Sequence, residues 1–459
     1  MKDIIQQKIV DINSLEKASL EMARLNMELS ILELEEELFK NKPDHLESIR
    51  FKWRTISTKV GDIRFKRRLY YNHKTKKYVF LLDKELGLRK RKRVSGEYLK
   101  LLVILSTMLT YRQIEYVIKQ AGFPPISHGT IFNEVRAFGE RESKKIKNEK
   151  DELFINGKIS TDKQKEVPIL FVEVDGIMLS SQEKDSKRFE AKIGLFHEGW
   201  EYTSPSKKRK KLKEPKIISG IYDSVEDFYE ELTLQINKKY NLDKTKVILN
   251  GDGASWIQKT GYDYFDDLTV QLDRFHIKKD IRMYYGNEVA EGLCRILGQG
   301  KKHVFLDTLE SLIYEGETKK NIEKRKEIFN HLKKNEKHLL DYRHRIEMEQ
   351  FSQELHGLGA IESYVDKNAA RRMKNRGMSW VREGAEAMIK ILMLAHNGIL
   401  KERLEDEFYH IKNPVQKLKY RKRKFEREWS NWLQAKMPVL TGPSSGKNWV
   451  RGLKSIATV

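Results

Sequence analysis

The chain has 459 residues, which is enough for about three domains, and 89 Lys and Arg against 67 Asp and Glu give it a formal charge of +22. Its single cysteine, Cys294, excludes an intrachain disulfide and a zinc site built from several cysteines. The least polar stretch, residues 101–110, is too short to span a bilayer. We therefore expect a cytoplasmic protein with a polyanionic partner and no membrane contact.

Residues 1–45 predict one helix. Apolar residues recur at alternating steps of three and four, which is the pattern of a coiled coil. These residues are Leu15, Ala18, Met22, Leu25, Leu29, Leu32 and Phe39. The pattern leaves two interpretations open: a helix packed on its own domain, and a helix that pairs two copies of the chain.

Residues 50–146 predict a basic region in two parts. Short strand-like runs separated by turns indicate a β-meander over residues 51–83. The run RKRKR (89–93) and an apolar helix over residues 97–110 follow. The second part begins after this helix and is a helix-turn-helix pattern.

In this pattern a first helix starts near Tyr111, and the two prolines of GFPPI (122–126) end it. Ser127 is a natural N-cap for a second helix over residues 128–140. Its inner face would be formed by Ile131, Val135 and Phe138. Its outer face carries side chains suited to base edges and phosphates, namely His128, Thr130, Asn133 and Arg136. Any helical hairpin shares this pattern, but the charge of the chain favours a DNA-binding unit.

After a polar linker (147–166), the pattern changes to α/β. Apolar strand-like runs lie at 168–174, 191–199, 216–222, 246–252 and 269–273, with helices at 225–240 and 254–259. Residues 276–358 show no strand pattern, so we expect an all-α insertion that separates a first part (165–275) of one domain from a second part (359–400). Residues 401–459 form a basic C-terminal region.

Two aspartates occupy equivalent places in this domain. Asp175 ends the first strand and Asp252 ends the fourth, and neighbouring strands lie only about 4.8 Å apart. Two carboxylates at that spacing repel each other unless a cation lies between them, and hard divalent cations prefer oxygen ligands. Taken singly, Asp175 fits an Asp-Gly hairpin and Asp252 fits a helix N-cap. The pair in a basic chain favours two Mg²⁺ ions, for which Mn²⁺ can substitute.

A third carboxylate should lie on a helix after the insertion. We favour Glu362, because a cationic stretch that could hold a phosphate strand follows it directly. That stretch contains Arg371, Arg372, Lys374 and Arg376. Glu383 is the runner-up, with Glu354 and Glu386 as further candidates, and an ordinary solvated glutamate is the alternative for Glu362 and for Glu383.

Several segments resemble a known family. VEVDGI (172–177), NGDGASWI (250–257), LDRFHIKK (272–279) and the stretch GAIES to RRMKNRGMSW (359–380) are similar to DDE transposases of bacterial insertion sequences, in the group called ISLre-two, which is related to the Mutator-like superfamily. RRLYYN…YVFLLD and MLTYRQIEYVIKQAG…ISHGTI extend the resemblance upstream, over most of the chain from about residue 60 to 400. It implies an RNase H-like fold whose catalytic, metal-binding residues correspond to Asp175, Asp252 and Glu362.

LDRFH also resembles the C/D-x-x-H signature of the Mutator-like group, here Asp273 and His276. His276 could contact a phosphate or a flipped base, and the alternative is an Asp–His pair that caps the next helix. Two further basic runs suit a phosphate backbone, KKRKKLK (207–213) and KLKYRKRKFER (417–427). The first falls between the second and third strands and begins with Lys207, Lys208 and Arg209.

Three functions fit these observations. The first is a transposase that binds insertion-sequence ends in double-stranded DNA, cuts them with Mg²⁺ and joins them to target DNA by a DDE mechanism. The second is a non-catalytic DNA-binding protein derived from a transposase, and the third is an RNase H-like nuclease without strand transfer. We expect the first function, because three facing acids without metal would only cost stability. We also expect the protein to be nucleoid-associated and to form a homodimer or a higher oligomer.

Overall fold

A computed structural model describes residues 11–157, 164–184, 187–203, 209–254, 261–316, 318–347, 354–374 and 377–408. The chain divides into two compact units, Met1–Glu402 and Arg403–Val459. Three expected features lie outside the described residues: the basic run 417–427, nearly all of the helix expected at 254–259, and the first ten residues of the N-terminal helix.

The N-terminal part is a helix on a small sheet. Helix α2 (Ile12–Lys40) packs on the antiparallel meander of β1 (Leu46–Thr58), β2 (Gly61–Asn72) and β3 (Lys77–Val79), so the predicted meander is confirmed. Its core consists of Ile56, Ile63, Phe65 and Leu82, with Ile31, Leu34 and Leu38 of α2 packed against it. The predicted heptad stripe is a different face of α2, and its members Leu15, Met22, Leu29 and Leu32 are exposed.

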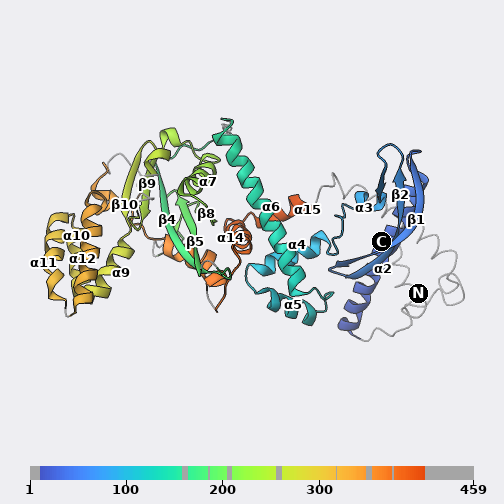
Figure 1. Cartoon of the computed structure of the whole chain (residues 1–459), viewed down its shortest axis with the longest axis horizontal. Helices are drawn as coiled ribbons and strands as arrows, with labels where there is room; N and C mark the ends of the chain where they lie inside the picture. Colours follow the sequence, from blue (N-terminus) through green and yellow to red (C-terminus); the bar gives the residue numbers. More distant parts are fainter. Residues whose placement is uncertain are drawn as a thin grey trace, which may run out of the picture. The chain divides into compact units, whose positions relative to one another are not determined.

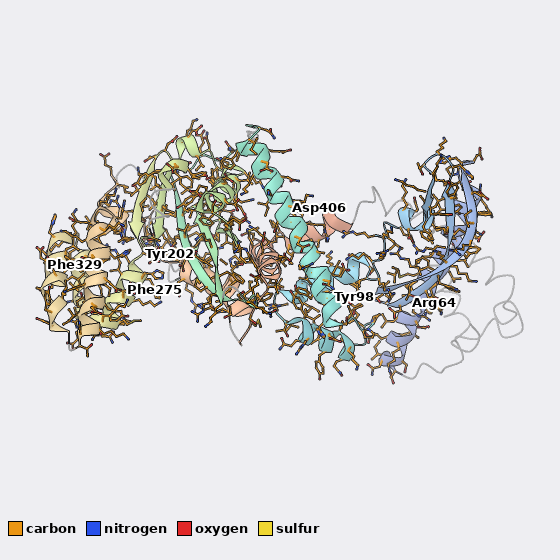
Figure 2. All side chains as sticks on the ribbon, in the orientation of Figure 1. Arg64, Tyr98, Tyr202, Phe275, Phe329 and Asp406 are labelled. Atoms are coloured by element: carbon orange, nitrogen blue, oxygen red, sulfur yellow. The ribbon has the colours of Figure 1, made fainter. Side chains whose placement is uncertain are left out.

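Four helices follow the meander along the chain, where the sequence predicts a last strand-like run and three helices. Residues expected to continue the last strand form α3 (Leu81–Glu85), and then come α4 (Gly96–Ser106), α5 (Tyr111–Gln120) and α6 (His128–Phe154). The last three begin at the capping side chains of Ser95, Thr110 and Ser127, each of which accepts a backbone N–H. Tyr98 of α4 (Figure 2) donates its hydroxyl to the Pro124 carbonyl at 2.6 Å and so fixes the turn between α5 and α6.

Helix α6 is longer than the sequence predicts. Ile131, Val135 and Phe138 are buried, as expected for its inner face. The helix continues to Phe154, so the prediction of a linker from residue 147 is wrong for its first eight residues. Gly139 explains where α6 docks, because a Cβ there would lie 2.4 Å from the carbonyl oxygen of Ala387. Only glycine allows the two backbones to approach so closely.

A five-stranded mixed sheet forms the centre of the second part (Figure 1). Its spatial order is β10-β9-β4-β5-β8, with β4 and β5 antiparallel, β5 and β8 antiparallel, and β4, β9 and β10 parallel. The strands are β4 (Ile169–Ser180), β5 (Arg188–His197), β8 (Lys216–Gly220), β9 (Lys246–Gly251) and β10 (Leu268–Leu272). A short hairpin of β6 (Trp200–Tyr202) and β7 (Lys210–Leu212) lies between β5 and β8 in the chain.

The sheet corrects one detail of the sequence analysis. Asp175 does not end its strand, because β4 runs on to Ser180 and stays paired with β5 throughout. What ends there is the parallel pairing with β9, whose last pair is Glu173 and Asn250. The alternative of an Asp-Gly hairpin at Asp175 is therefore also wrong.

Helices fill the rest of this part. They are α7 (Val225–Asn237), α9 (Arg274–Tyr285), α10 (Asn287–Gly298), α11 (Lys302–Ser311), α12 (Lys319–Lys334), α13 (Ile361–Val365), the π-helical η6 (Asp366–Lys374), α14 (Arg382–His396) and α15 (Leu400–Phe408), with 3₁₀ turns between some of them. Within the described residues of 276–358 there is no strand, as expected for the insertion. Its own core includes Leu293, Phe305 and Leu332, with Phe329 (Figure 2) packed against it. No helix in the described ranges has both the length and the apolar character needed to cross a bilayer.

Candidate metal centre

Three side chains from distant parts of the sequence meet beside the central sheet. Asp175 of β4, His276 of α9 and Glu362 of α13 each offer one ligand atom, and these atoms all lie within 4.8 Å of one another. Carboxylate and imidazole groups are common ligands of divalent metal ions. The sequence analysis expects Asp175 and Glu362 in such a group, and the structure adds His276 to them.

Asp175 is the most perturbed member of this cluster. Its carboxylate accepts the N–H of Gly176 at 2.7 Å. Burial raises its pKa to about 6, and the negative charges of Glu362 and Asp252 add to the rise, while the Gly176 hydrogen bond and His276 oppose it. Burial and the neighbouring negative charges thus disfavour the ionised carboxylate, and a bound cation would relieve this penalty.

Glu362 lies in the first turn of α13 and is exposed. The runner-up, Glu383, lies elsewhere, in the first turn of α14, where its carboxylate is 3.4 Å from the guanidinium of Arg136 and 72% exposed. Of the two candidates, only Glu362 joins Asp175 in the cluster. Glu354, another candidate, accepts a hydrogen bond from the Tyr202 hydroxyl at 2.7 Å.

Asp252 lies beside the cluster rather than within it. It follows β9 directly, is exposed, and accepts the N–H of Ala254 at 2.9 Å. Gly253, at φ +86°, turns the chain where a Cβ would lie 2.5 Å from Leu272. The charge of Asp252 nevertheless acts on the cluster, because it raises the pKa of both Asp175 and His276. Asp252 is therefore near enough for its charge to act on the cluster, although it is not one of its members.

Asp273 and His276 form the pair that caps the next helix, which is the second of the two interpretations given above. Asp273 is buried and caps α9 by accepting the N–H of Phe275 at 2.8 Å, so it is not free to contact DNA. Its other oxygen lies 3.4 Å from Nδ1 of His276. This contact with Asp273, followed by the charges of Asp175 and Asp252, raises the pKa of His276. The protonated form of His276 is therefore favoured next to the carboxylates.

The sequence analysis misses a row of buried polar residues beneath the site. Two positions before Asp175, Asp252 and Asp273 lie Glu173, Asn250 and Gln271. They are cross-strand partners on β4, β9 and β10, and all three are at most 1% exposed. Asn250 donates to Glu173 at 3.4 Å, and Gln271 donates to Asn250 at 3.3 Å. Because side chains alternate along a strand, this row shares its face with the acids.

Glu173 also holds the helix that carries Glu362. Its carboxylate accepts the backbone N–H groups of Gly359, Ala360 and Ile361 at 2.8, 3.3 and 3.3 Å. These are the unpaired donors at the start of α13, and a carboxylate there also favours the helix dipole. One side chain of β4 thus fixes the position of Glu362 relative to Asp175. The alternation of Glu and Asp in VEVDGI is the signal that could have predicted it.

Of the four residues of α6 that are predicted to contact DNA, three already contact other protein groups. The N–H and Nδ1 of His128 bind Glu115, Thr130 binds Ser127, and Arg136 pairs with Glu140 and Glu383. Asn133 is exposed, as are His128 and Thr130. Four residues on this helix thus remain available at the surface, although His128 and Arg136 would have to exchange partners.

The cationic stretch after Glu362 divides into two groups. The prediction that Arg372 contacts DNA is wrong, because its side chain is 5% exposed and its Nε donates to the carbonyl of Ser106 at 2.7 Å. Arg371 and Lys374 are exposed, and Arg371 pairs with Asp366 at 2.7 Å. Lys207, Lys208 and Arg376 lie outside the described residues. Arg209 is described and exposed.

Comparison with known proteins adds a family. Residues 15–407 match the family described as "Uncharacterised protein family (UPF0236)". The chain belongs to this family. The match covers the meander, the helix-turn-helix segment, the sheet and every member of the metal cluster.

Curated UPF0236 proteins of two bacteria are similar along most of the chain. A Streptococcus gallolyticus protein named "UPF0236 protein in vanSb 3'region" is 26% identical over 371 residues, which is 78% of this chain and 75% of the relative. Two proteins of Caldanaerobacter subterraneus subsp. tengcongensis are each 25% identical over 346 residues, 75% of this chain and 68% of the relative. Their printed names carry four and eleven locus labels in that one strain.

Proposed function

We propose that this protein is a metal-dependent DNA transposase that cuts DNA at the ends of its element and joins them to a target. The observation that carries the proposal is the meeting of Asp175, Glu362 and His276, within 4.8 Å, beside the strand that leads to Asp252. Two elements more than 180 residues apart in the chain supply the two acids. In a chain of charge +22, an acidic cluster of this kind has a clear use next to a polyanion.

The donor set fits a divalent cation. Asp175 and Glu362 would hold it with carboxylate oxygens, and Asp252 would join them after a local loop movement. Mn²⁺ accepts the same oxygen ligands and can therefore substitute for Mg²⁺. Two such ions, when bound, supply the charge that activates an attacking oxygen and stabilises the leaving oxygen at phosphorus.

The chain's own groups have defined tasks in this proposal. Glu173 positions the helix of Glu362, and Asp273 orients His276 and favours its protonated form. His276 is then placed to contact a phosphate oxygen next to the carboxylates. Arg371 and Lys374, which are exposed after Glu362, would hold the DNA strand that leads to the site.

The sheet supports an RNase H-like domain. Three successive strands pair antiparallel, and after helix α7 two further strands add in parallel to the opposite side of the first. The first strand is therefore central, with Asp175 on it and Asp252 after its parallel neighbour. This is the arrangement that the resemblance to DDE transposases implies.

The relatives support mobility of the gene. A name with eleven locus labels in one strain describes a sequence present in many copies. Multiplication within a genome is what a transposase produces for its own gene, whereas a DNA-binding protein retained for a host task needs one copy. This observation favours the transposase over the non-catalytic alternative.

The test is a strand-joining assay with the full chain, Mg²⁺ and labelled duplexes taken from both sides of the gene. The proposal expects cleavage at a defined position and joining of the labelled 3′ end to unlabelled DNA. Cleavage without joining would favour the nuclease, and retarded mobility without cleavage would favour the non-catalytic binder. Asp175→Asn should abolish both reactions and leave end binding nearly unchanged.

A further inference from the structure

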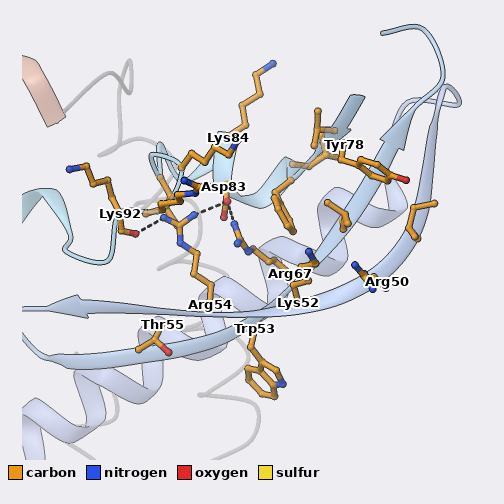
Figure 3. A pocket seen from close by; sticks show the side chains of 18 of the residues that line it. Arg50, Lys52, Trp53, Arg54, Thr55, Arg67, Tyr78, Asp83, Lys84 and Lys92 are labelled. Atoms are coloured by element: carbon orange, nitrogen blue, oxygen red, sulfur yellow. Dashed lines mark hydrogen bonds and ion pairs between the residues drawn. The ribbon is translucent and has the colours of Figure 1, made fainter. Parts of the chain in front are cut away.

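A large cationic cavity lies away from the metal cluster, on the N-terminal meander. It has a volume of about 1670 Å³ and is bounded by β1, β2, α3 and the loop 88–93 (Figure 3). Ten Lys and Arg residues and only two Asp residues line it. The volume exceeds the range of about 300–1,000 Å³ that is usual for sites of small molecules. The cavity therefore suits a large anionic partner.

Buried Arg54 builds one wall of the cavity. Its guanidinium binds Asp83 at 2.7 Å and the carbonyls of Arg89 and Lys92 at 2.8 and 2.7 Å. Figure 3 shows the contacts of Arg54 with Asp83 and Lys92. Arg54 is 8% exposed, so this is an interior contact and not a chance surface pair. Its effect is to hold the run RKRKR (89–93) against the sheet.

The acidic residues of the cavity do not neutralise it. Asp83 is shared by Arg54 and Arg67, so one carboxylate faces two guanidinium groups. Burial, together with the charge of Arg54, lowers the pKa of Arg67 to about 10, and it therefore stays cationic at neutral pH. A positive charge remains even in the most buried part of the cavity.

Its exposed cations have no acidic partners. Among the described residues, none forms a salt bridge with Arg50, Lys52, Lys84, Lys90 or Arg91, and all five are exposed. Lys92, which also lines the cavity, pairs with Glu134 at 2.7 Å. Unpaired like charges held together repel each other, and an anion with several charged groups removes that repulsion.

We propose that this cavity holds the phosphodiester backbone of duplex DNA, as a second contact separate from the metal cluster. The partner is duplex DNA because the cations come from an extended two-stranded surface and from a loop fixed to it, and a duplex offers a row of phosphates on that scale. The contact is independent of base sequence, because lysine and arginine ends directed at phosphates carry no sequence information. The identity of the nucleic acid as DNA rests on the proposed function.

The test measures DNA binding by the full chain, without divalent metal, to an unrelated duplex of about 30 base pairs over a series of salt concentrations. The cavity variant is Lys52→Ala/Lys84→Ala/Lys90→Ala. The control, Lys319→Ala/Lys320→Ala/Lys334→Ala, removes the same charge from exposed positions of α12. Each phosphate contact contributes about 0.9 to the slope of log K against log salt. The cavity variant should lower that slope by about 2–3 and weaken binding at least about tenfold at 0.1 M salt.

The control should keep the wild-type slope, and both variants should keep the wild-type melting temperature because the mutated side chains are exposed. Equal slopes for the two variants would overturn the proposal. Equal loss of binding to duplex RNA or to vesicles with phosphatidylserine would overturn the choice of DNA. Absence of strand joining in wild-type protein, with the cavity effect intact, would count against the proposed function and not against this site.

Discussion

At the scale of single residues, Asp175 carries the electrostatic cost of the site. It is half-buried on a central strand, and two further carboxylates surround it. His276, held by Asp273, is the cation that offsets part of this cost in the metal-free protein. The site is therefore most stable either with Asp175 protonated or with a divalent cation present.

This balance predicts a pH-dependent effect of Asp175→Asn on stability. The pKa of Asp175 is raised to about 6 in the folded protein from its ordinary value of 3.8, so the folded state holds the proton more tightly. Its protonated form therefore stabilises the fold below pH 4, and this contribution is lost as the pH rises through 6. In chelator-treated protein, Asp175→Asn should raise the free energy of unfolding by roughly 2–3 kcal/mol at pH 8 and change little at pH 4.

Urea unfolding of both proteins at the two pH values measures this difference. Equal stability changes at pH 4 and pH 8 would show that Asp175 is not under electrostatic strain. Added Mn²⁺ should stabilise the wild type and not the variant, because only the wild type offers the carboxylate.

Sequence alone predicts those site residues whose role follows from the residue type and from the place of the residue in a strand or helix. The strand-plus-acid pattern predicts Asp175 and the cationic stretch predicts Glu362, and the two lie in one cluster. His276 was identified from a signature, with its role left open, and Glu173 was missed because a buried Glu has no signal of its own in one sequence. Arg372 was misplaced because burial depends on α4, which is distant in the chain. Whether a charged residue points inward is a tertiary property.

At the scale of elements, the site depends on how α13 is attached to β4. Helix α13 has only five residues and no side-chain cap of its own at Ala360. The Glu173 carboxylate replaces that cap from the neighbouring strand, and His197, with Nε2 3.5 Å away, lies on its other side. The geometry of the two acids is therefore set by one interior contact.

Glu173→Gln should separate positioning from stability. The neutral amide binds the three N–H groups less well, so the unfolding free energy should fall by about 2 kcal/mol and Mn²⁺ affinity should fall about tenfold. The matched control is Glu198→Gln, another buried carboxylate just after β5, which loses contacts with Lys165, Lys213 and Tyr240. It should lose similar stability and keep its Mn²⁺ affinity. Equal affinity in the two variants would show that Glu173 only stabilises the fold.

The exposed stripe of α2 predicts self-association. Its packed face is used by the meander, whereas Met22, Leu29 and Leu32 are 52%, 49% and 54% exposed. Met22→Glu/Leu29→Glu should lower the apparent mass in sedimentation, because charges would replace the apolar contact between two copies. Ser19→Glu/Ser30→Glu adds the same charge beside the stripe and should have no effect. An unchanged mass in the first variant would contradict a dimerisation role.

The order of elements was largely predictable, and their ends were not. Alternating and apolar runs predict the meander and the five strands, because the periodicity of apolar residues indicates which face is buried. The lack of such runs predicts the all-α insertion. The predicted strand ends at Asp175 because Asp-Gly is a turn signal. In the structure, pairing with β5 continues the strand beyond Asp175. In the same way, packing on α14 and α7 extends α6 through a polar stretch that has no strong helical pattern. Tertiary contacts override local propensity in both cases.

At the scale of the whole molecule, the distribution of charge accounts for the division of tasks. Ten of the 89 Lys and Arg residues line the meander cavity, whereas Asp175 and Glu362 meet beside the sheet. Backbone contacts that are independent of sequence would hold DNA, and the acids would act on one phosphate of it. UPF0236 proteins with many copies in one genome are consistent with such an enzyme acting on its own gene.

The most direct test of the central claim compares Glu362→Gln with Glu383→Gln in the same assays of Mn²⁺ binding and DNA cleavage. The substitutions are identical and both side chains are exposed in the first turn of a helix, so neither should unfold the protein. We predict that Glu362→Gln lowers Mn²⁺ affinity and reduces cleavage at least about a hundredfold, while Glu383→Gln retains both. Full activity in Glu362→Gln, or its loss in Glu383→Gln alone, would contradict the account.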